Sequence, residues 1–183
     1  VLIMTATPIP RTLTMSLYGD LDLSIIDELP PGRKDVITVH RKDKNRLKVF
    51  GFIRDQIKQG RQIYIVYPLI EESKKMDLKY LEDGLESIIR EFDKENYSIG
   101  VMHGRMRSSN KDIEMNNFLN GKIDILISTT VIEVGVNVPN ASVMIIENAE
   151  RFGLSQLHQL RGRVGRGKYD SYCVLMTNDK ISE

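Results

Sequence analysis

Short, continuous runs of apolar residues constrain the fold of this chain more than any other feature of its sequence. They consist of Ile, Val, Leu, Met, Tyr and Cys and occupy residues 63–66, 125–127, 143–146 and 173–176. Strands that are apolar on both faces belong in a parallel sheet covered by helices. Stretches with helical spacing separate these runs. The sequence therefore predicts an α/β fold, a parallel sheet with helices on both of its faces.

Glycines mark where two of the expected helices end. A helix over residues 44–59 should bury Leu47, Phe50 and Ile57 and stop at Gly60. Gly121 closes another helix in the same way. The remaining expected elements are strands at residues 36–40 and 98–102 and helices at residues 78–92 and 108–120.

Composition narrows the functional classes. The chain has 183 residues, enough for one domain, or for one domain and a piece of another. The net charge is only +1, so the chain is not basic overall, and any contact with nucleic acid must come from a local basic patch. The single Cys173 supports no disulfide framework, which fits a reducing cytoplasm. No apolar run is long enough to span a membrane.

Two prolines divide the chain. Leu29-Pro30-Pro31-Gly32-Arg33 cannot form a helix or an inner strand, because proline fixes the backbone and removes a hydrogen-bond donor. Residues 27–35 are therefore the predicted linker between residues 1–26 and a domain at residues 36–183. Val1–Ala6 reads as the middle of a strand, so we expect the chain to be a piece of a longer protein.

The stretch from Gln156 to Arg166 is rich in arginine and glycine. As a helix, it has an apolar stripe of Leu154, Leu157, Leu160 and Val164 and a polar stripe that includes Gln159, Arg163 and Arg166. The guanidinium fork fits phosphate oxygens, which suggests a phosphate sensor. A helix with a basic solvent-exposed face would show the same pattern. Arg161 falls off the polar stripe and is expected to pair with Glu147 or Glu133.

Polar residues follow several expected strands, at the edge where parallel sheets bind ligands. His103-Gly104-Arg105 offers a turn and a helix start that attract phosphate, although this stretch alone fits a capped helix with a surface histidine better. His103 has no second histidine or cysteine at ligand spacing, so no metal site is expected. Thr5 and Thr7 also follow a strand, where small hydroxyl residues are most often structural.

The stretch Thr129–Pro139 leaves a strand with hydroxyl groups that can hold a phosphodiester. Gly135 permits close approach, and Asn137 can bond a sugar hydroxyl. A strand-to-helix turn rich in capping residues would look the same. The chain contains no Gly-x-x-x-x-Gly-Lys-Ser/Thr loop and no acidic strand end of the kind that holds the magnesium of an NTPase. It thus supplies parts of a phosphate site without the usual cradle.

Together these stretches resemble the second motor lobe of superfamily-two helicases, and most of all the RecG-type ATP-dependent DNA helicases of bacterial recombination and repair. The resemblance covers essentially the whole chain. Transcription-repair coupling translocases share much of it, but Asp27–Arg33 and Ile145–Asn148 look more like RecG. The residues that carry it are Met4–Thr12, Ile26–Arg33, Val101–Met106, Thr129–Ala141 and Glu150–Gly167.

The resemblance implies a RecA-like fold of the P-loop NTPase type, with residues 1–26 ending the first motor lobe and residues 36–183 forming the second. It also implies roles for single positions: coupling for Thr5 and Thr7, DNA-backbone contact for His103, Gly104, Arg105 and Thr129, nucleotide-sugar contact for Gly135 and Asn137, and catalysis for Gln159, Arg163 and Arg166. The two arginines would reach the γ-phosphate from across the cleft. An acidic residue is common at the position of Asn137, which leaves open any role that depends on charge.

The resemblance further implies partners and a cofactor. ATP with Mg²⁺ would be bound mainly by a first motor lobe, and branched DNA would be the substrate. Closing the cleft about Pro30-Pro31 would move the DNA contacts along a strand. A non-catalytic nucleic-acid-binding module is the alternative from another class. An unrelated flavodoxin-like domain would explain the sheet but not the arginine-rich helix.

Overall fold

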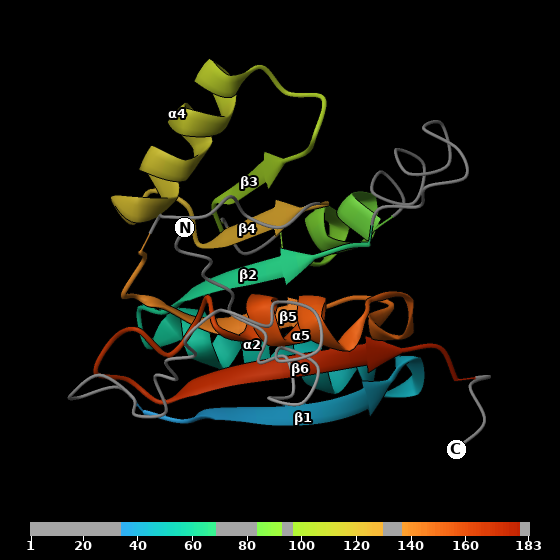
Figure 1. Cartoon of the computed structure of the whole chain (residues 1–183). Helices are drawn as coiled ribbons and strands as arrows, with labels where there is room; N and C mark the ends of the chain where they lie inside the picture. Colours follow the sequence, from blue (N-terminus) through green and yellow to red (C-terminus); the bar gives the residue numbers. More distant parts are fainter. Residues whose placement is uncertain (1–33, 69–83, 93–96, 130–136, 180–183) are drawn as a thin grey trace, which may run out of the picture.

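The computed structural model describes residues 34–68, 84–92, 97–129 and 137–179. They form an open six-stranded sheet in which all paired strands are parallel, in the order β1-β6-β5-β2-β4-β3 (Figure 1). The strands are β1 (Val36–Lys42), β2 (Gln62–Val66), β3 (Ile99–Met102), β4 (Ile125–Ser128), β5 (Ala141–Ile146) and β6 (Ser171–Thr177). The predicted parallel sheet is therefore confirmed.

Helices connect the strands and cover both faces of the sheet. The α-helices are α2 (Arg46–Lys58), α4 (Ser108–Leu119) and α5 (Leu154–Arg161), with short 3-10 helices η1 (Asp43–Asn45) and η3 (Ala149–Arg151). Residues 84–92 are also helical. Gly60 and Gly121 adopt positive φ angles of 76° and 72°, which glycine tolerates at a helix end. Both predicted helix stops are thus correct.

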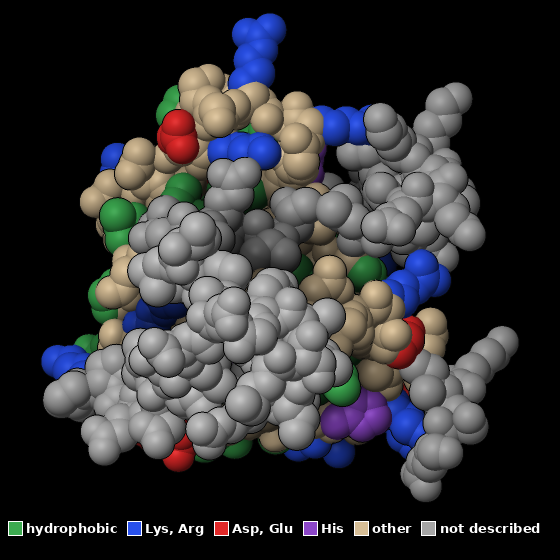
Figure 2. Space-filling view, in the orientation of Figure 1, with side chains coloured by type: hydrophobic (Ala, Val, Ile, Leu, Met, Phe, Trp, Pro, Cys, Tyr) green, Lys and Arg blue, Asp and Glu red, His purple; other side chains and the backbone are tan. Residues whose placement is uncertain are grey.

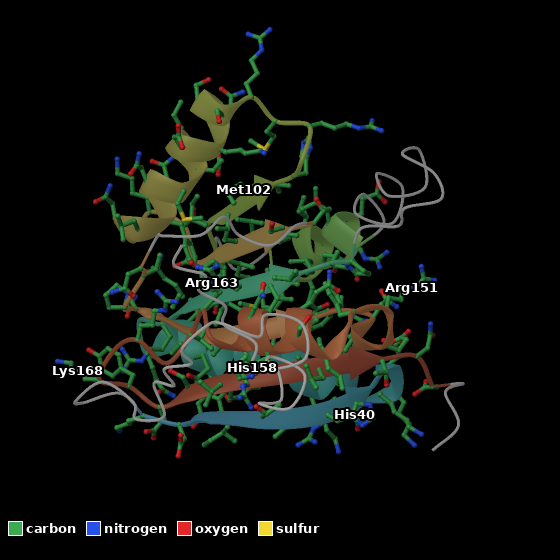
Figure 3. All side chains as sticks on the ribbon, in the orientation of Figure 1. His40, Met102, Arg151, His158, Arg163 and Lys168 are labelled. Atoms are coloured by element: carbon green, nitrogen blue, oxygen red, sulfur yellow. The ribbon has the colours of Figure 1, made fainter. Side chains whose placement is uncertain are left out.

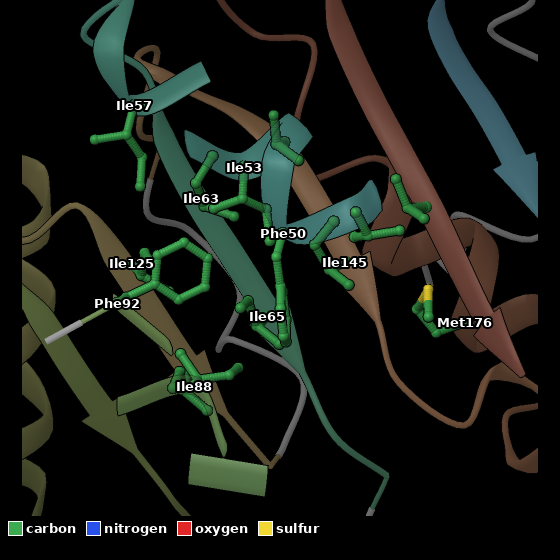
Figure 4. Close-up of a cluster of buried hydrophobic side chains, with 14 of the residues drawn as sticks. Phe50, Ile53, Ile57, Ile63, Ile65, Ile88, Phe92, Ile125, Ile145 and Met176 are labelled. Carbon is green, nitrogen blue, oxygen red and sulfur yellow. The ribbon is translucent and has the colours of Figure 1, made fainter. Parts of the chain in front are cut away.

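Alternation along the inner strands divides the core into two layers. In β2, Ile63 and Ile65 face α2 and the 84–92 helix, while Tyr64 and Val66 face α4 and α5. Figure 4 shows the first layer, where Phe50 and Ile53 of α2 and Phe92 pack over the strands. Every residue of β2, β4 and β5 is buried. This is the burial that the continuous apolar runs predicted.

One predicted core residue of α2 lies outside the core. Leu47 is 76% exposed, whereas Phe50 and Ile57 are buried as expected. The first turn of α2 extends past the carboxyl ends of the strands, since Arg46 there contacts Glu147 just beyond β5. The buried residues of α2 include Val49, Phe50 and Ile53, and at helical spacing their shared face turns away from Leu47.

Residues 1–33 lie outside the described part of the chain, and with them the expected strand at residues 1–6 and most of the predicted linker. Lys34 and Asp35 lead directly into β1. Within the described residues, no helix is both long and apolar enough to cross a membrane.

Candidate functional site

The carboxyl ends of β3 and β4 bring together the residues expected to contact a nucleic-acid backbone. The two strands pair with Met102 opposite Ser128, so His103 and Thr129 leave the sheet side by side. The Thr129 amide donates to the Met102 carbonyl at 3.2 Å, and the Met106 amide donates to the His103 carbonyl at 3.1 Å. These bonds fix the turn that carries Gly104 and Arg105 against the end of β4.

Exposure differs among these residues. Gly104 and Arg105 are exposed, His103 is partly buried, and Thr129 is only 5% exposed. The Nδ1 atom of His103 is buried and has no hydrogen-bond partner. The N-terminus of α4 follows, and its N-cap, Arg107, makes no side-chain capping bond. Ser108 and Ser109 are the first helical residues.

Helix α5 positions the first of the two arginines. Its N-terminus is closed by Gln156, whose Oε1 accepts from the Gly153 amide at 3.0 Å. After the last helical residue, the Arg163 amide donates to the Leu160 carbonyl at 3.0 Å. Leu160 and Val164 are both fully buried. Arg163 is therefore held in a turn between two buried anchors.

The second arginine follows a break in the backbone direction. Gly165 has a φ of 80°, and a Cβ there would lie 2.9 Å from Cγ2 of Val36. Arg166 is exposed, and its Nε donates to the Gly162 carbonyl at 3.2 Å. The predicted helical stripe of Gln159, Arg163 and Arg166 is thus wrong beyond the helix end at Arg161. The helix ends just before Gly162, and Gly165, with its positive φ, turns the chain before Arg166.

The charges of both arginines nevertheless reach one buried ring. Burial raises the pKa of Tyr64 to about 12, and the charges of Arg163 and Arg166 oppose this rise. Tyr64 lies in the middle of β2 on the face covered by α4 and α5. Both guanidinium groups therefore lie close enough to Tyr64 for their charges to act on its hydroxyl group.

Arg163 and Arg166 lie toward the ends at which the strands begin, whereas the turn after β3 lies where the strands end. Helix α5 starts after the carboxyl end of β5 and leads to the amino end of β6, so Arg163 lies near the strand starts (Figure 3). Strands of four to seven residues place these edges roughly 13–23 Å apart. The described Lys and Arg side chains that are visible in Figure 2 lie at several separate places on this face. A single ligand that contacts both the arginines and the turn after β3 must therefore be extended, or else the two places bind separate ligands.

Comparison with known proteins shows to which family the chain belongs. Residues 42–168 match the model of the helicase conserved C-terminal domain. The chain belongs to this helicase family. The fold is the RecA-like fold of such lobes: the structure titled "Mss116p DEAD-box helicase domain 2 bound to an RNA duplex" superposes with a TM-score of 0.55 at 20% identity, over 79% of this chain and 54% of that chain.

Proteins named ATP-dependent DNA helicase RecG resemble the chain along its whole length. The Synechocystis protein is 54% identical over 100% of this chain, and the Thermotoga maritima protein 52% over 97%. The structure titled "Structure of RecG bound to three-way DNA junction" superposes over 97% of the chain with a TM-score of 0.78 and 48% identity, and the match covers 23% of that chain. The chain spans 22% and 23% of the two curated relatives.

Other predicted positions of the helicase lobe are described only in part. Asn137 is exposed and stands shortly before β5. Gly135, Thr5 and Thr7 lie outside the described residues, as does most of Thr129–Pro139. Gln159 is exposed on α5, and Leu154, expected on the buried stripe, is 86% exposed. Leu154 is the first residue of α5 and lies past the end of β5.

The expected ion pair of Arg161 with Glu147 is also wrong. Glu147 is 4% exposed and accepts from Arg46, with Oε1–Nη1 and Oε2–Nη2 distances of 2.7 and 2.9 Å. The guanidinium of Arg161 lies 3.3 Å from Nδ1 of His158 instead. The other proposed partner, Glu133, lies outside the described residues. No motif marked Arg46, so sequence reasoning missed this pair.

The helicase lobe contains a near match to a phosphate cradle. Gly162–Lys168 has the Gly-x-x-x-x-Gly-Lys spacing, but Tyr169 replaces the hydroxyl residue that follows. The run follows a helix and precedes a strand, the reverse of the order a cradle requires. Among the described residues, no cluster of His, Cys, Asp and Glu side chains could hold a metal ion. The lobe can therefore offer arginine donors to a phosphate, but not the usual triphosphate cradle.

Proposed function

We propose that the chain is the second motor lobe of a RecG-type ATP-dependent DNA helicase acting on branched DNA in recombination and repair. The observation that carries the proposal is the likeness of about half of all residues, over the whole chain, to proteins of that name. In this proposal residues 1–26 end the first lobe, residues 27–35 link the lobes, and residues 36–183 form the second lobe. A transcription-repair coupling translocase is the nearest alternative.

Arg163 and Arg166 act as arginine fingers in this proposal. ATP and Mg²⁺ bind mainly to the first lobe, and closure brings the two guanidinium groups toward the phosphates. Arginine donors stabilise the charge that develops on the transferred phosphoryl group. The anchoring of Arg163 by Leu160 and Val164 supports this role, because a finger must be held in place before the cleft closes. Gln159 lies on the exposed side of the same helix.

The turn after β3 and the end of β4 contact the DNA backbone in this proposal. The exposed Arg105 and the amides of the Gly104 turn are suited to phosphate oxygens, which carry no sequence information. Gly135 and Asn137 would line the nucleotide sugar, and Thr5 and Thr7 would couple nucleotide state to lobe movement. Binding should therefore depend on salt and only weakly on base sequence.

The absence of a phosphate cradle gives a direct test. We expect the 183-residue chain to hydrolyse no ATP above background, with or without single-stranded or three-way-junction DNA. It should bind DNA with a salt-dependent affinity, and Arg105→Gln should weaken that binding while Lys58→Gln does not. DNA-stimulated turnover by the chain alone would refute the assignment as one half of a composite site. Binding that is insensitive to salt would refute the backbone contacts.

A further inference from the structure

A polar pocket lies where the strands of the sheet begin, on the segment that follows Arg166. Its volume is about 210 Å³, and Gln59, Arg61, Lys168 and Tyr169 contribute to its lining. These residues come from the end of α2 and from the segments just before β2 and β6. Lys168 projects from the side of the molecule where the strands begin (Figure 3). The turn of Gly104 and Arg105 lies at the other edge.

Positive charge exceeds negative charge in this pocket. Its lining contains Lys34, Arg61 and Lys168 but only one carboxylate, that of Asp170. Lys34 pairs with Asp170 at 2.8 Å, which satisfies that carboxylate. Within the described part of the chain, neither Arg61 nor Lys168 forms an ion pair. No carboxylate among the described residues therefore neutralises these two cations.

The ring of Tyr169 holds these two cations close together. The guanidinium carbon of Arg61 lies 3.2 Å from the ring centroid, and Nζ of Lys168 lies 5.3 Å from it. Stacking restrains the guanidinium plane while its N–H groups remain able to bind an anion. A hydrogen bond from Arg61, followed by the positive charge of Lys168, lowers the pKa of Tyr169. The site is therefore organised before any ligand arrives.

We propose that Arg61 and Lys168 bind one phosphate group above the ring of Tyr169. A guanidinium fork and a second cation match the charge and geometry of a phosphate. Drug-sized ligands occupy pockets of roughly 300–1,000 Å³, so this pocket suits a single phosphate rather than a whole nucleotide. A nucleic-acid backbone or free phosphate can supply the group. The inference depends on local charges alone and does not require the proposed motor function.

Nuclear magnetic resonance of the ¹⁵N-labelled 183-residue chain tests the pocket with inorganic phosphate. We expect saturable shifts at the Arg61 side chain and at the amides of Lys168 and Tyr169. The shifts should disappear in Arg61→Gln/Lys168→Gln and persist in the charge-matched control Lys58→Gln/Lys122→Gln. If the double variant fails to fold, Lys168→Gln alone should weaken phosphate binding several-fold. Shifts that do not saturate, or that persist in the pocket variant, overturn the proposal.

Fluorescence anisotropy with labelled duplex DNA identifies the source of the phosphate. Each duplex phosphate contact contributes roughly 0.9 to the slope of log affinity against log salt. If DNA occupies the pocket, Arg61→Gln/Lys168→Gln should lower this slope by about 1, while the control pair leaves it unchanged. An unchanged slope together with saturable phosphate shifts assigns the pocket to free phosphate. Neither the nuclear magnetic resonance titration nor the anisotropy measurement uses ATP. A negative result in either would therefore count against the pocket and not against the proposed motor function.

Discussion

The ion pair of Arg46 and Glu147 ties the start of α2 to the segment that leads from β5 to α5. Glu147 is almost fully buried, and both of its oxygens accept from Arg46, at 2.7 and 2.9 Å. Arg46 also contacts Asp43 at 2.6 Å. Replacing Arg46 with Met keeps the side-chain bulk but leaves the Glu147 carboxylate buried without its partner.

The cost of Arg46→Met follows from this burial. Removing one partner of a buried pair costs about 3–5 kcal/mol. The Arg46 side chain is 31% exposed and that of Glu147 5%, so water screens part of the interaction and we expect about 2–3 kcal/mol. For a domain of this size, that corresponds to a fall in Tm of roughly 4–12 °C. Arg46→Met/Glu147→Leu should recover much of the loss, because no buried charge remains.

Urea unfolding followed by circular dichroism measures the effect, with Lys34→Met as the matched control. The Lys34–Asp170 pair has a similar length of 2.8 Å, but its side chains are 53% and 64% exposed. Its loss should cost less than about 1 kcal/mol. Equal and small losses from Arg46→Met and Lys34→Met would refute the view that burial makes the Arg46 pair important.

Two further predictions concern the segment that follows α5 and the strand β6. Gly165→Ala should destabilise the domain by at least about 1 kcal/mol, because its φ is 80° and the new Cβ would meet Val36. Gly162→Ala should cost less, because φ at that position is −68°. Thermal melts of the two variants measure the difference. Burial raises the pKa of the Cys173 thiol from 9.0 to about 11, so its contribution to stability is complete below pH 9 and is lost as the pH rises toward 11. Wild type should lose about 1 kcal/mol more than Cys173→Ala between pH 8 and pH 10 in urea unfolding, and equal losses would contradict the shift.

Much of the fold could be predicted because a strand that is buried on both faces of the sheet has apolar residues at every position. The runs at 63–66, 125–127 and 143–146 are apolar at every position, and each became an inner strand. Gly60 and Gly121 marked helix ends, since both positions need a backbone that other residues rarely adopt. The order of the strands was not predictable in this way, because the apolar pattern of an inner strand does not specify its neighbours.

The failed predictions concern residues at the ends of elements. Leu47 and Leu154 were predicted to be core residues, but each lies in the first turn of its helix and stays exposed. Arg166 follows the helical pattern in sequence, yet Gly165 turns the chain before it. Glu147 pairs with Arg46, which is distant from it in sequence, and not with the nearer Arg161. Periodicity describes positions within an element and does not report where the element ends or which distant charge approaches it.

The proposed arginine finger is tested most directly by Arg163→Ala in a full-length RecG-type protein that contains this chain. We predict that ATP turnover falls by roughly 10³–10⁵, or about 4–7 kcal/mol, while ATP binding changes little. Arg163→Lys, which keeps the charge but loses the fork, should also be strongly impaired, whereas the exposed Arg90→Ala should behave as wild type. An unchanged turnover number for Arg163→Ala would contradict the central claim that this lobe completes the ATP site from across the cleft.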